Sequence, residues 1–389
     1  MNPCYFLGSA LHTSLGSTLV AQVDALRRPP TPPGTVTVHY ADKSQVLPYK
    51  LLADCDMEDA AQKLHSVVDK VIDTALESAQ LTRSERRAAG LFVGTSSFDI
   101  SSTEQEYRND LQHNPAALLM RTHSSQGMLG DLLRRRHGLY GPDFSFNTAC
   151  TASANALMYA DAMIRSGRIQ HALVMGIELH NSLTALGFHG LQLLTTSTMK
   201  PFDRSRNGLV LGEGCSALVL GPRKSSQHQW HLKGSANLCD THSVSATNPD
   251  GSVVAEVIGA AVNHAALRPQ DIAAIKVHGT ASLLNDEAEA AGMKRVFSEL
   301  PPLAAIKPFI GHTLGACGLN ELLLFCAAAD REFLIATPGI GNNAVEDGDT
   351  KLGVSLNQRT CEMLPGNFLM NYFGFGGNNT ALVISNVRE

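Results

Sequence analysis

Apolar residues recur along this chain with two different spacings. Residues 57–80 carry them at every third or fourth position, which predicts an amphipathic helix. Short apolar runs bounded by glycine, such as 90–96 and 172–176, predict buried strands. The same spacings predict further helices at 17–27, 115–137 (interrupted near Gly127 and Gly130), 251–267, 285–298 and 315–329. They predict further strands at 3–12, 212–221, 232–238, 272–277, 352–357, 367–372 and 381–385.

This alternation of strands and helices predicts a layered α/β architecture. Residues 221–230 are polar and rich in turn formers, and they separate two stretches with a similar order of elements. We therefore expect two halves, residues 1–225 and 226–389. The proline-rich segment 28–34 and residues 180–200 are expected to be loops.

Composition narrows the possible functions only slightly. The 389 residues are 44% hydrophobic and 17% charged, which is ordinary for a globular protein, and the net charge of -5 does not favour nucleic-acid binding. The eight cysteines show no Cys-x-x-Cys spacing, which argues against zinc and a disulfide framework. Neither a membrane-spanning apolar run nor a signal peptide is apparent, so we expect a cytoplasmic protein with reduced thiols.

Cys150 stands where the pattern changes from strand to helix. Phe144 and Phe146 alternate with polar residues before it, and small or apolar residues follow it at helical spacing up to Gly167. A thiol at a helix N-terminus lies beside free N–H groups and the positive end of the helix dipole, which favours the thiolate by up to about 2 kcal/mol. The pattern therefore predicts a nucleophile that is usable near neutral pH. The alternative is a small cysteine that fills core space.

Three further stretches place polar residues after strands or among glycines. They are His278-Gly-Thr-Ala-Ser, the segment from Lys307 to Gly318 that contains His312, and Phe373-Gly-Phe-Gly-Gly-Asn. Ligands of open α/β sheets gather beyond the carboxyl ends of the strands, so one cysteine and two histidines could surround a reacting thioester there. Taken singly, each stretch also has a structural interpretation, such as a tight turn or a surface charge.

Together, these motifs resemble those of the β-ketoacyl-[acyl carrier protein] synthases, the elongating ketosynthases of the thiolase-like fold. The resemblance runs from about residue 90 to the C-terminus and is weaker before it. It also includes Lys200-Pro-Phe-Asp-Arg, followed by Gly208 and Gly212-Glu-Gly. It implies two similar α/β halves in a five-layered αβαβα arrangement. The first half would carry the nucleophilic cysteine and the second half the two catalytic histidines.

The resemblance also implies roles for single residues. Cys150 would hold the acyl group as a thioester. His278 and His312 would hydrogen-bond the malonyl thioester as carbon dioxide leaves, and the backbone N–H groups of Cys150 and Phe375 would form the oxyanion hole. The implied supporting residues are the Lys307–Glu321 ion pair, the acid Asp286, the gate Phe375, and Thr280 and Ser282 as contacts of phosphopantetheine. No cofactor is implied beyond the phosphopantetheine of the carrier.

Differences from the family's usual motifs affect the finer assignment. Two histidines favour decarboxylative elongation, because thiolases pair Cys and His with a second Cys. Ala281 and Ser282 replace a glycine and a threonine, and this change, together with Leu-Leu-Asn-Asp at 283–286, favours a bacterial polyene (aryl-polyene) or type II polyketide pathway over housekeeping fatty-acid synthesis.

The resemblance also implies the partners. They are an acyl carrier protein, which is acidic, and a second ketosynthase chain in a homodimer or a heterodimer. The residues proposed for carrier docking are Arg121, Arg204 and Arg206. The alternative function is a chain-length-factor-like partner subunit with little activity of its own, although such subunits usually lack the nucleophilic cysteine.

Overall fold

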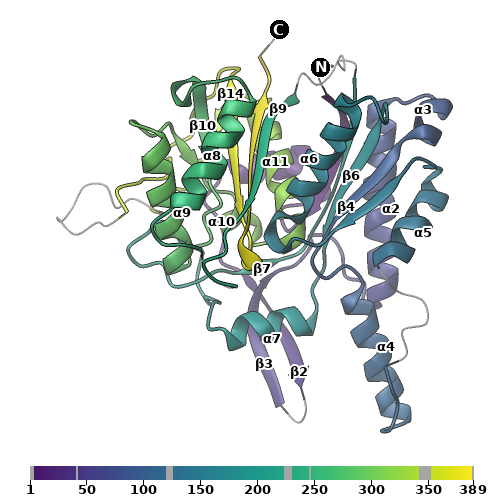
Figure 1. Cartoon of the computed structure of the whole chain (residues 1–389). Helices are drawn as coiled ribbons and strands as arrows, with labels where there is room; N and C mark the ends of the chain where they lie inside the picture. The colour runs from purple at the N-terminus through teal and green to yellow at the C-terminus, as the bar shows by residue number, and fades with distance from the viewer. Residues whose placement is uncertain are drawn as a thin grey trace.

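One mixed sheet runs through the computed structural model, which describes residues 4–40, 43–119, 126–222, 230–244, 247–340 and 352–387. Strands from the first half of the chain form one side of the sheet, and strands from the second half form the other. The two sides meet where Tyr5 pairs with His231. In sheet order the strands are β11 (Leu303–Ala304), β10 (Ile272–Lys276), β14 (Asn367–Phe373), β15 (Asn378–Ser385), β9 (His231–Cys239), β1 (Tyr5–Thr13), β8 (Gly214–Gly221), β6 (Ala172–Glu178), β4 (Gly90–Gly94) and β5 (Asp143–Phe146) (Figure 1).

The longer helices lie in three groups around these strands. The described helices are α1 (Leu19–Leu26), α2 (Ala60–Ala79), α3 (Arg83–Ala88), α4 (Ile100–His113), α5 (Gln126–His137), α6 (Ala152–Arg165), α7 (Ser182–Gly190), α8 (Ser252–His264), α9 (Leu283–Val296), α10 (Lys307–Ile310) and α11 (Cys317–Ala329). Helix α2 packs on the strands of the first half, and α8 packs on those of the second half. Helices α6 and α11 pack on each other.

Alternation of side chains across each strand separates three apolar cores. In β1, Phe6 belongs to the central core around α6 and α11, whereas its neighbours Tyr5 and Leu7 belong to a core under α2. In β14, Phe368 faces the central core, and Leu369 faces a third core under α8 and α9. Successive side chains of a strand point to opposite faces of the sheet. Each half of the sheet therefore has an apolar core on both of its faces. The result is the expected five-layered order of helices, strands, helices, strands and helices.

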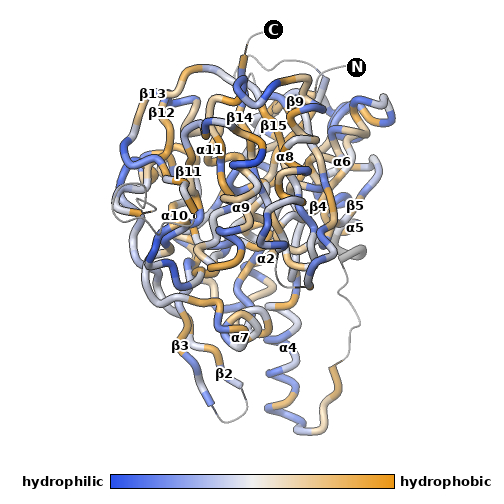
Figure 2. Tube along the Cα trace, turned by 60° about the vertical axis from the view of Figure 1, so that its left-hand side comes forward, coloured by the Kyte–Doolittle hydropathy of each residue, from blue (hydrophilic) through white to orange (hydrophobic). Residues whose placement is uncertain are grey.

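Four of the described helices, α3, α4, α7 and α10, occupy segments for which the sequence did not predict a helix. Helix α4 was missed because all its residues are half-buried or exposed, so it has no apolar stripe (its hydropathy is mostly hydrophilic in Figure 2). Residues 180–200, predicted as loop, contain α7, whose N-cap Asn181 accepts a hydrogen bond from the N–H of Thr184 at 2.9 Å. Ala185 is the one buried residue of α7, so this helix has no repeat of buried apolar positions from which it could have been predicted.

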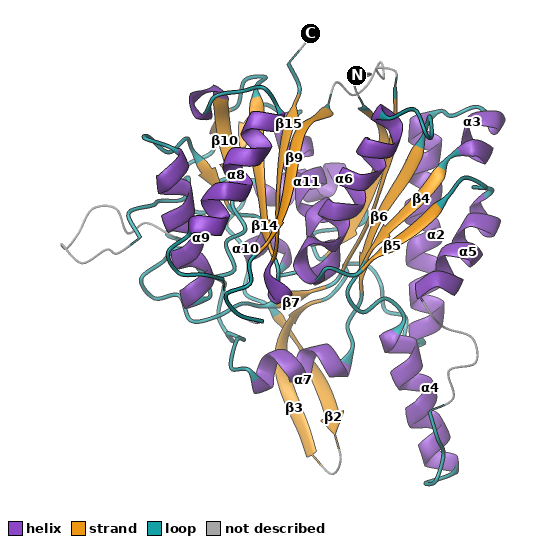
Figure 3. Ribbon diagram, in the orientation of Figure 1, coloured by secondary structure: helices purple, strands orange, loops and turns teal. Residues whose placement is uncertain are grey.

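A hairpin and two boundaries also differ from the prediction. Strands β2 (Gly34–Tyr40) and β3 (Lys43–Lys50) pair with each other and, through β3, with the short β7 (Leu211–Gly212), and the hairpin extends from the same end of the molecule as α4 (Figure 3). Within the segment 115–137, predicted as one helix, residues 115–119 form no helix, and α5 runs from Gln126 to His137 through Gly127 and Gly130. The predicted break there is therefore wrong.

The strand predicted at 352–357 is also wrong. Leu352, Val354 and Leu356 are buried alternately, as in a strand, but the segment joins its neighbours through isolated bonds such as Asn357 N–H to the Leu303 carbonyl at 2.8 Å. The remaining short strands are β12 (Phe333–Leu334) and β13 (Cys361–Glu362). Much of the predicted boundary at 221–230 lies outside the described residues, so the division into residues 1–225 and 226–389 stays a prediction.

Candidate active site

Cys150 lies between β5 and α6, in the short 3₁₀ turn Ala149–Thr151. Ala149 has a φ of +49°, an uncommon conformation for a residue with a side chain, and this turn places the buried sulfur beneath the first turn of α6. Gly94 of β4 permits this approach, because an added Cβ would lie 2.3 Å from the backbone of Ser153. The predicted position of Cys150, next to the first helical residue, is confirmed.

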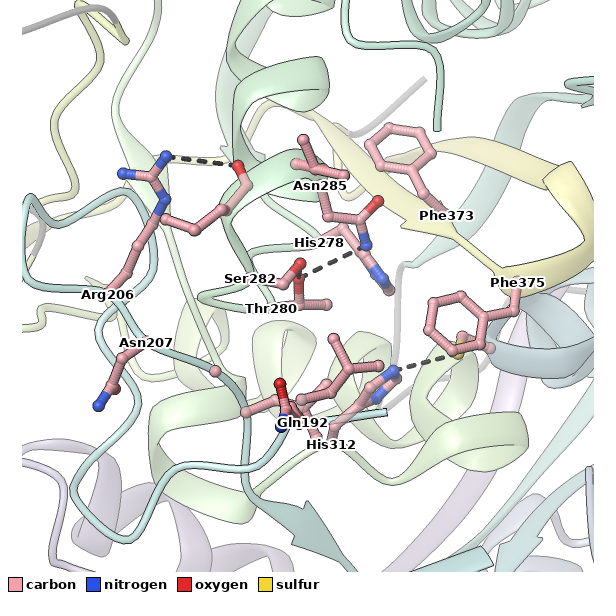
Figure 4. A pocket seen from close by; sticks show the side chains of 16 residues that line it. Gln192, Arg206, Asn207, His278, Thr280, Ser282, Asn285, His312, Phe373 and Phe375 are labelled. Carbon is pink, nitrogen blue, oxygen red and sulfur yellow. Dashed lines mark hydrogen bonds between the residues drawn. The ribbon is translucent and has the colours of Figure 1, made fainter. Parts of the chain in front are cut away.

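The structure brings Cys150, His278 and His312 to one pocket of about 470 Å³. Figure 4 shows both imidazoles and Phe375 directed into the same space. Its lining also includes Thr280, Ser282 and residues of the loops before β7 and α9. The three reactive side chains follow β5, β10 and the short helix α10, so residues from both halves of the chain complete the site.

His312 contacts the nucleophile directly, with its Nε2 3.1 Å from the sulfur of Cys150. Its backbone is held on both sides, because its N–H donates to the Val210 carbonyl at 2.7 Å and its carbonyl accepts from Gly212 at 3.0 Å. Gly212 leaves room for this segment, since an added Cβ would lie 2.2 Å from the carbonyl oxygen of Ile310. These two backbone hydrogen bonds therefore fix the place of the His312 imidazole.

His278 lies across the pocket, with its ring centroid 5.5 Å from that of His312 and the ring planes at 85°. Its Nδ1 is 3.3 Å from the ammonium of Lys307, which also donates to the His278 carbonyl at 2.7 Å. An ammonium can only donate, so Nδ1 is the acceptor and Nε2 carries the proton. That Nε2 is buried and has no hydrogen-bond partner among the described residues, which leaves an N–H free for a ligand.

A buried ion-pair array supports His278. The Glu321 carboxylate accepts from Lys307 at 2.7 Å through Oε1 and from Lys276 at 2.7 Å through Oε2. Burial lowers the pKa of Lys307, but Glu321 together with the neighbouring Cys317 and Cys150 outweighs this effect, and the resulting pKa is raised. The predicted Lys307–Glu321 pair is therefore present, whereas the sequence analysis did not identify Lys276.

The protonation states differ from those predicted from the helix terminus. Burial raises the pKa of Cys150 to about 11, because desolvation of a thiolate outweighs the opposing effects of Lys307 and of a hydrogen bond from the backbone of Phe375. The predicted lowering of this thiol pKa is therefore wrong. Burial, aided by Lys307, also lowers the pKa of His278 and of His312 well below the usual value. A neutral thiol thus faces two neutral imidazoles.

The glycine-containing segment around Phe375 closes the pocket over Cys150. The Phe375 ring stacks on Phe188 of α7 with centroids 5.7 Å apart and planes at 9°. Asn378, which follows this segment, accepts from Thr151 at 2.6 Å and Asn155 at 2.8 Å, and both donors lie beside the cysteine at the start of α6. The backbone of Phe375 and the backbone of Cys150 are thereby held next to the same sulfur.

The remaining predicted residues are distributed around the pocket. Thr280 and Ser282 line it and lie within 3.0 Å of each other through their hydroxyl oxygens. Asp286 does not contact His278. Its carboxylate accepts from the N–H groups of Phe202 at 2.7 Å and Ala281 at 3.2 Å, and so holds the loop that carries Thr280.

The acid that supports His278 is Glu289, which the sequence analysis missed. It accepts from the N–H groups of His278 at 2.7 Å and Gly279 at 2.9 Å. Its place one helical turn after Asp286 was the available signal, because residues three apart lie on one face of a helix.

The arginines proposed for carrier docking differ in exposure. Arg204 is exposed, whereas the side chain of Arg206 is only 8% exposed and lies 3.3 Å from Glu287. Arg121 lies outside the described residues. Within the described ranges, no group of His, Cys, Asp and Glu side chains could hold a metal ion, and no helix is long and apolar enough to cross a membrane.

Comparison with known proteins gives consistent matches in both halves of the chain. Residues 54–226 match the model of the β-ketoacyl synthase N-terminal domain, and residues 231–340 match that of the β-ketoacyl synthase C-terminal domain. The chloroplastic 3-oxoacyl-[acyl-carrier-protein] synthase I of Arabidopsis thaliana is 29% identical over 334 residues, which cover 80% of this chain and 69% of that protein.

Polyketide enzymes are similar as well. The ketoacyl synthase alpha subunit of the tetracenomycin polyketide synthase from Streptomyces glaucescens is 30% identical over 271 residues, 65% of this chain and 62% of that protein. Among solved structures, a chain from the complex of a ketosynthase with its chain length factor from Xenorhabdus doucetiae has a TM-score of 0.83. It is 23% identical in sequence, and the match covers 99% of this chain and 98% of that chain.

Proposed function

The chain belongs to the β-ketoacyl synthase family, and from that premise we propose that Cys150, His278 and His312 carry out its condensation reaction. The reaction of the family, β-ketoacyl synthesis during fatty-acid or polyketide elongation, is the reaction of this chain. The observation that carries the residue assignment is the 3.1 Å contact between Cys150 and His312, with His278 on the opposite wall of the same pocket.

In the first half-reaction, Cys150 takes the acyl group from the carrier. Its sulfur attacks the thioester carbonyl, a new carbon–sulfur bond forms, and the bond to the sulfur of phosphopantetheine breaks. The thiol proton passes to Nε2 of His312 during the attack and returns to the departing thiolate of the carrier. The raised thiol pKa makes proton removal part of the attack rather than a step before it.

In the second half-reaction, a malonyl thioester loses carbon dioxide, and the electron pair of the broken carbon–carbon bond becomes an enolate. The N–H group at Nε2 of His278 holds the enolate oxygen, and Lys307 fixes the tautomer of His278. Once Cys150 is acylated it offers His312 no thiol proton, so the ring proton of His312 moves from Nδ1 to Nε2 and a second N–H group holds the same oxygen. The enolate carbon attacks the acyl-Cys150 carbonyl, whose oxyanion is bound by the backbone N–H groups of Cys150 and Phe375. Collapse of this intermediate releases the thiolate and a 3-ketoacyl thioester.

The surrounding residues have supporting roles in this proposal. Thr280 and Ser282 contact the phosphopantetheine arm from the pocket wall. Phe375 blocks the space beyond the sulfur until Cys150 is acylated, and its stacking on Phe188 holds the closed position. Asp286 and Glu321 act indirectly, through the loop before α9 and through Lys307.

For the pathway and the partners, we propose a type II polyketide or aryl-polyene system and a dimer with a second ketosynthase-like chain. Relatives include a polyketide ketoacyl synthase subunit, and the fold matches a chain from a ketosynthase–chain length factor complex. Among the described strands, β5 at the end of the sheet pairs only with β4, so its outer edge is available to a partner. Arg204 offers positive charge to an acidic carrier protein in the cytoplasm.

Reconstitution tests the residue assignment. The purified chain is mixed with acyl- and malonyl-carrier proteins, and the 3-ketoacyl product is measured by mass spectrometry. We expect Cys150→Ala to abolish the product and Cys239→Ala, at an exposed cysteine, to retain it. Full condensation by Cys150→Ala would overturn the assignment.

The same assay separates the chain from a chain-length-factor-like subunit. Such a subunit would give product only when a second ketosynthase is added, and its product would persist in Cys150→Ala. The nucleophile and both histidines are present here, which supports an active synthase. The acyl group that remains on Cys150 after expression in the native host, identified by mass spectrometry, would show whether the pathway makes polyenes, polyketides or fatty acids.

A further inference from the structure

Lys276, the last residue of β10, is fully buried two residues before His278. Its ammonium donates to Oε2 of Glu321 at 2.7 Å and to the Asn371 carbonyl at 2.7 Å. The same nitrogen lies 3.5 Å from the centroid of the Tyr372 ring, a cation–π distance. These three contacts account for its three N–H donors, so the side chain has one defined position.

Glu321 is shared between two ammonium groups. Its other oxygen, Oε1, accepts from Lys307 at 2.7 Å, and all three side chains are at most 1% exposed. One carboxylate neutralises only one of the two lysines, so the array carries a net positive charge. A buried charge acts over several ångströms, because there is little water to screen it.

The other titratable groups around the two imidazoles are two thiols and two carboxylic acids. The buried thiols hold their protons, since burial raises the pKa of Cys150 to about 11 and also raises that of Cys317. On α9, burial raises the pKa of Asp286 to about 7 and raises that of Glu289. The titratable and charged groups that face the imidazoles from neighbouring elements are Lys276, Lys307, Glu321, Cys150, Cys317, Glu289 and Asp286.

We propose that Lys276 is a positioning residue of the active site. It fixes Glu321, which in turn holds Lys307 against Nδ1 of His278. It also adds positive charge that keeps both imidazoles neutral. The inference rests on the proposed roles of His278 and His312 as N–H donors. Without Lys276, Oε2 of Glu321 has lost its 2.7 Å donor and the carboxylate is free to turn away from Lys307. Both imidazoles then gain protons more easily.

The direction of the histidine shifts agrees with this geometry. For His278 and His312 alike, burial is the largest cause of the lowered pKa, and both Lys307 and Lys276 add to it. Burial lowers the pKa of Lys276 itself to about 8, so the lysine is mostly charged below about pH 7, on the acidic side where the imidazoles gain protons. Removing its charge therefore raises the pH below which the imidazoles become protonated.

The test measures decarboxylation of malonyl-carrier protein from pH 5 to pH 8 by wild type and Lys276→Met. Protonation turns either imidazole into an imidazolium and adds a positive charge to the pocket during decarboxylation. We therefore expect the decarboxylation rate to fall at acidic pH. We expect the acidic limb of Lys276→Met to lie about one pH unit higher than that of wild type. The loss of kcat relative to wild type should be largest at pH 5 and absent at pH 8, with KM for the malonyl carrier unchanged within about twofold.

Lys50→Met is the matched control, because Lys50 is also a buried lysine whose pKa burial lowers to about 8. Its ammonium donates instead to the Thr31 carbonyl at 2.7 Å, and its acidic limb should coincide with that of wild type. Lys276→Gln keeps a polar side chain without the charge and serves as the test if Lys276→Met does not fold. It should shift the acidic limb in the same direction.

Two results would overturn the inference. One is an unmoved acidic limb in folded Lys276→Met and Lys276→Gln, and the other is an equal shift in Lys50→Met. An inactive wild type would contradict the proposed function instead, so the two failures are distinguishable.

Discussion

At the scale of single residues, the environment of Cys150 decides how the nucleophile works. The sequence correctly placed this thiol beside a helix start, but the predicted thiolate assumed partial exposure. A helix terminus stabilises a thiolate by at most about 2 kcal/mol, and complete burial costs more than that. Whether a cysteine at such a turn is buried depends on Phe375 and Gly374, which lie more than 220 positions away in the chain.

The pH dependence of alkylation tests this point. The alkylation rate of Cys150 by iodoacetamide should increase continuously from pH 7 to pH 9, because a pKa of about 11 leaves the thiol mostly protonated throughout that range. Peptide mass spectrometry follows Cys150 separately, with the exposed Cys239 as an internal reference. A plateau for Cys150 below pH 7 would mean that the thiolate is already formed in the resting enzyme.

The motif residues Cys150, His278 and His312 could be predicted from the sequence because each lies in a distinctive local pattern. Lys276 and Glu289 have no such pattern, since their roles depend on which strand and helix face the histidine loop. Asp286 was predicted as a supporting acid, and it holds the loop that carries Thr280. A carboxylate one turn away on α9 lies next to the backbone of His278 instead.

At the scale of elements, a buried amide network couples the nucleophile turn to the glycine-containing segment. Asn378 accepts three hydrogen bonds, from Thr151 at 2.6 Å, Asn155 at 2.8 Å and Asn237 at 2.7 Å. These donors come from the start of α6 and from β9, so Asn378 connects both halves of the chain. The network keeps the backbone N–H of Phe375 in register with Cys150.

Asn378→Ala should destabilise the protein by about 2–4 kcal/mol, because its loss leaves buried donors without an acceptor. Asn386→Ala is the control, since Asn386 accepts a single bond from Gly366 at 2.8 Å, and we expect a loss of at most about 1 kcal/mol there. Urea unfolding measures both values. Equal losses in the two variants would argue against a coupled network.

The packing of α6 on β4 gives a second prediction at this scale. In Gly94→Ala the added Cβ would lie 2.3 Å from the backbone of Ser153, so α6 must move and carry Cys150 with it. We expect a loss of several kcal/mol in stability, of the size found for overpacked cores, and a fall in acyl loading. Gly259→Ala within α8 is the control. Apart from the neighbouring backbone of α8 itself, no described atom lies within 4 Å of its added Cβ, so we expect a gain of up to about 1 kcal/mol.

At the scale of the whole molecule, the layered order was predictable and the projecting elements were not. Buried strands and helices such as β6 and α2 have a strict periodicity, because each buries a defined face. Helix α4 and strand β2 bury little, so their spacing carried little information. The segment 352–357 shows the opposite error, because its alternate burial occurs without a ladder of strand hydrogen bonds.

Buried acids also determine how the whole fold responds to alkaline pH. Burial raises the pKa of several thiols and phenols, namely those of Cys4, Cys150, Cys215, Cys317, Cys326, Tyr49 and Tyr372. A folded pKa above the unfolded value gives stability that is present at low pH and lost as the pH rises. Burial lowers the pKa of Lys50 and Lys276, and these two lysines add stability as the pH rises. They are outnumbered by the thiols and phenols, so the net effect is a loss of stability.

The free energy of unfolding should therefore decrease from pH 8 to pH 10. Each fully buried thiol contributes about 2 kcal/mol to this decrease, given an unfolded pKa of about 8.5. Cys215→Ala removes one such group far from any charged partner, so its unfolding free energy should fall by about 2 kcal/mol less over the same range. Parallel curves for the variant and wild type would show that Cys215 ionises equally in both states.

The most direct test of the central claim follows the acyl group on and off the sulfur. Wild type and His278→Ala are incubated with acyl-carrier protein, and the Cys150 peptide is examined by mass spectrometry before and after malonyl-carrier protein is added. We predict that both proteins carry the acyl group on Cys150, and that discharge is at least about a hundredfold slower in His278→Ala, which lacks the enolate donor. An acyl group on another cysteine, or equally fast discharge from both proteins, would contradict the account.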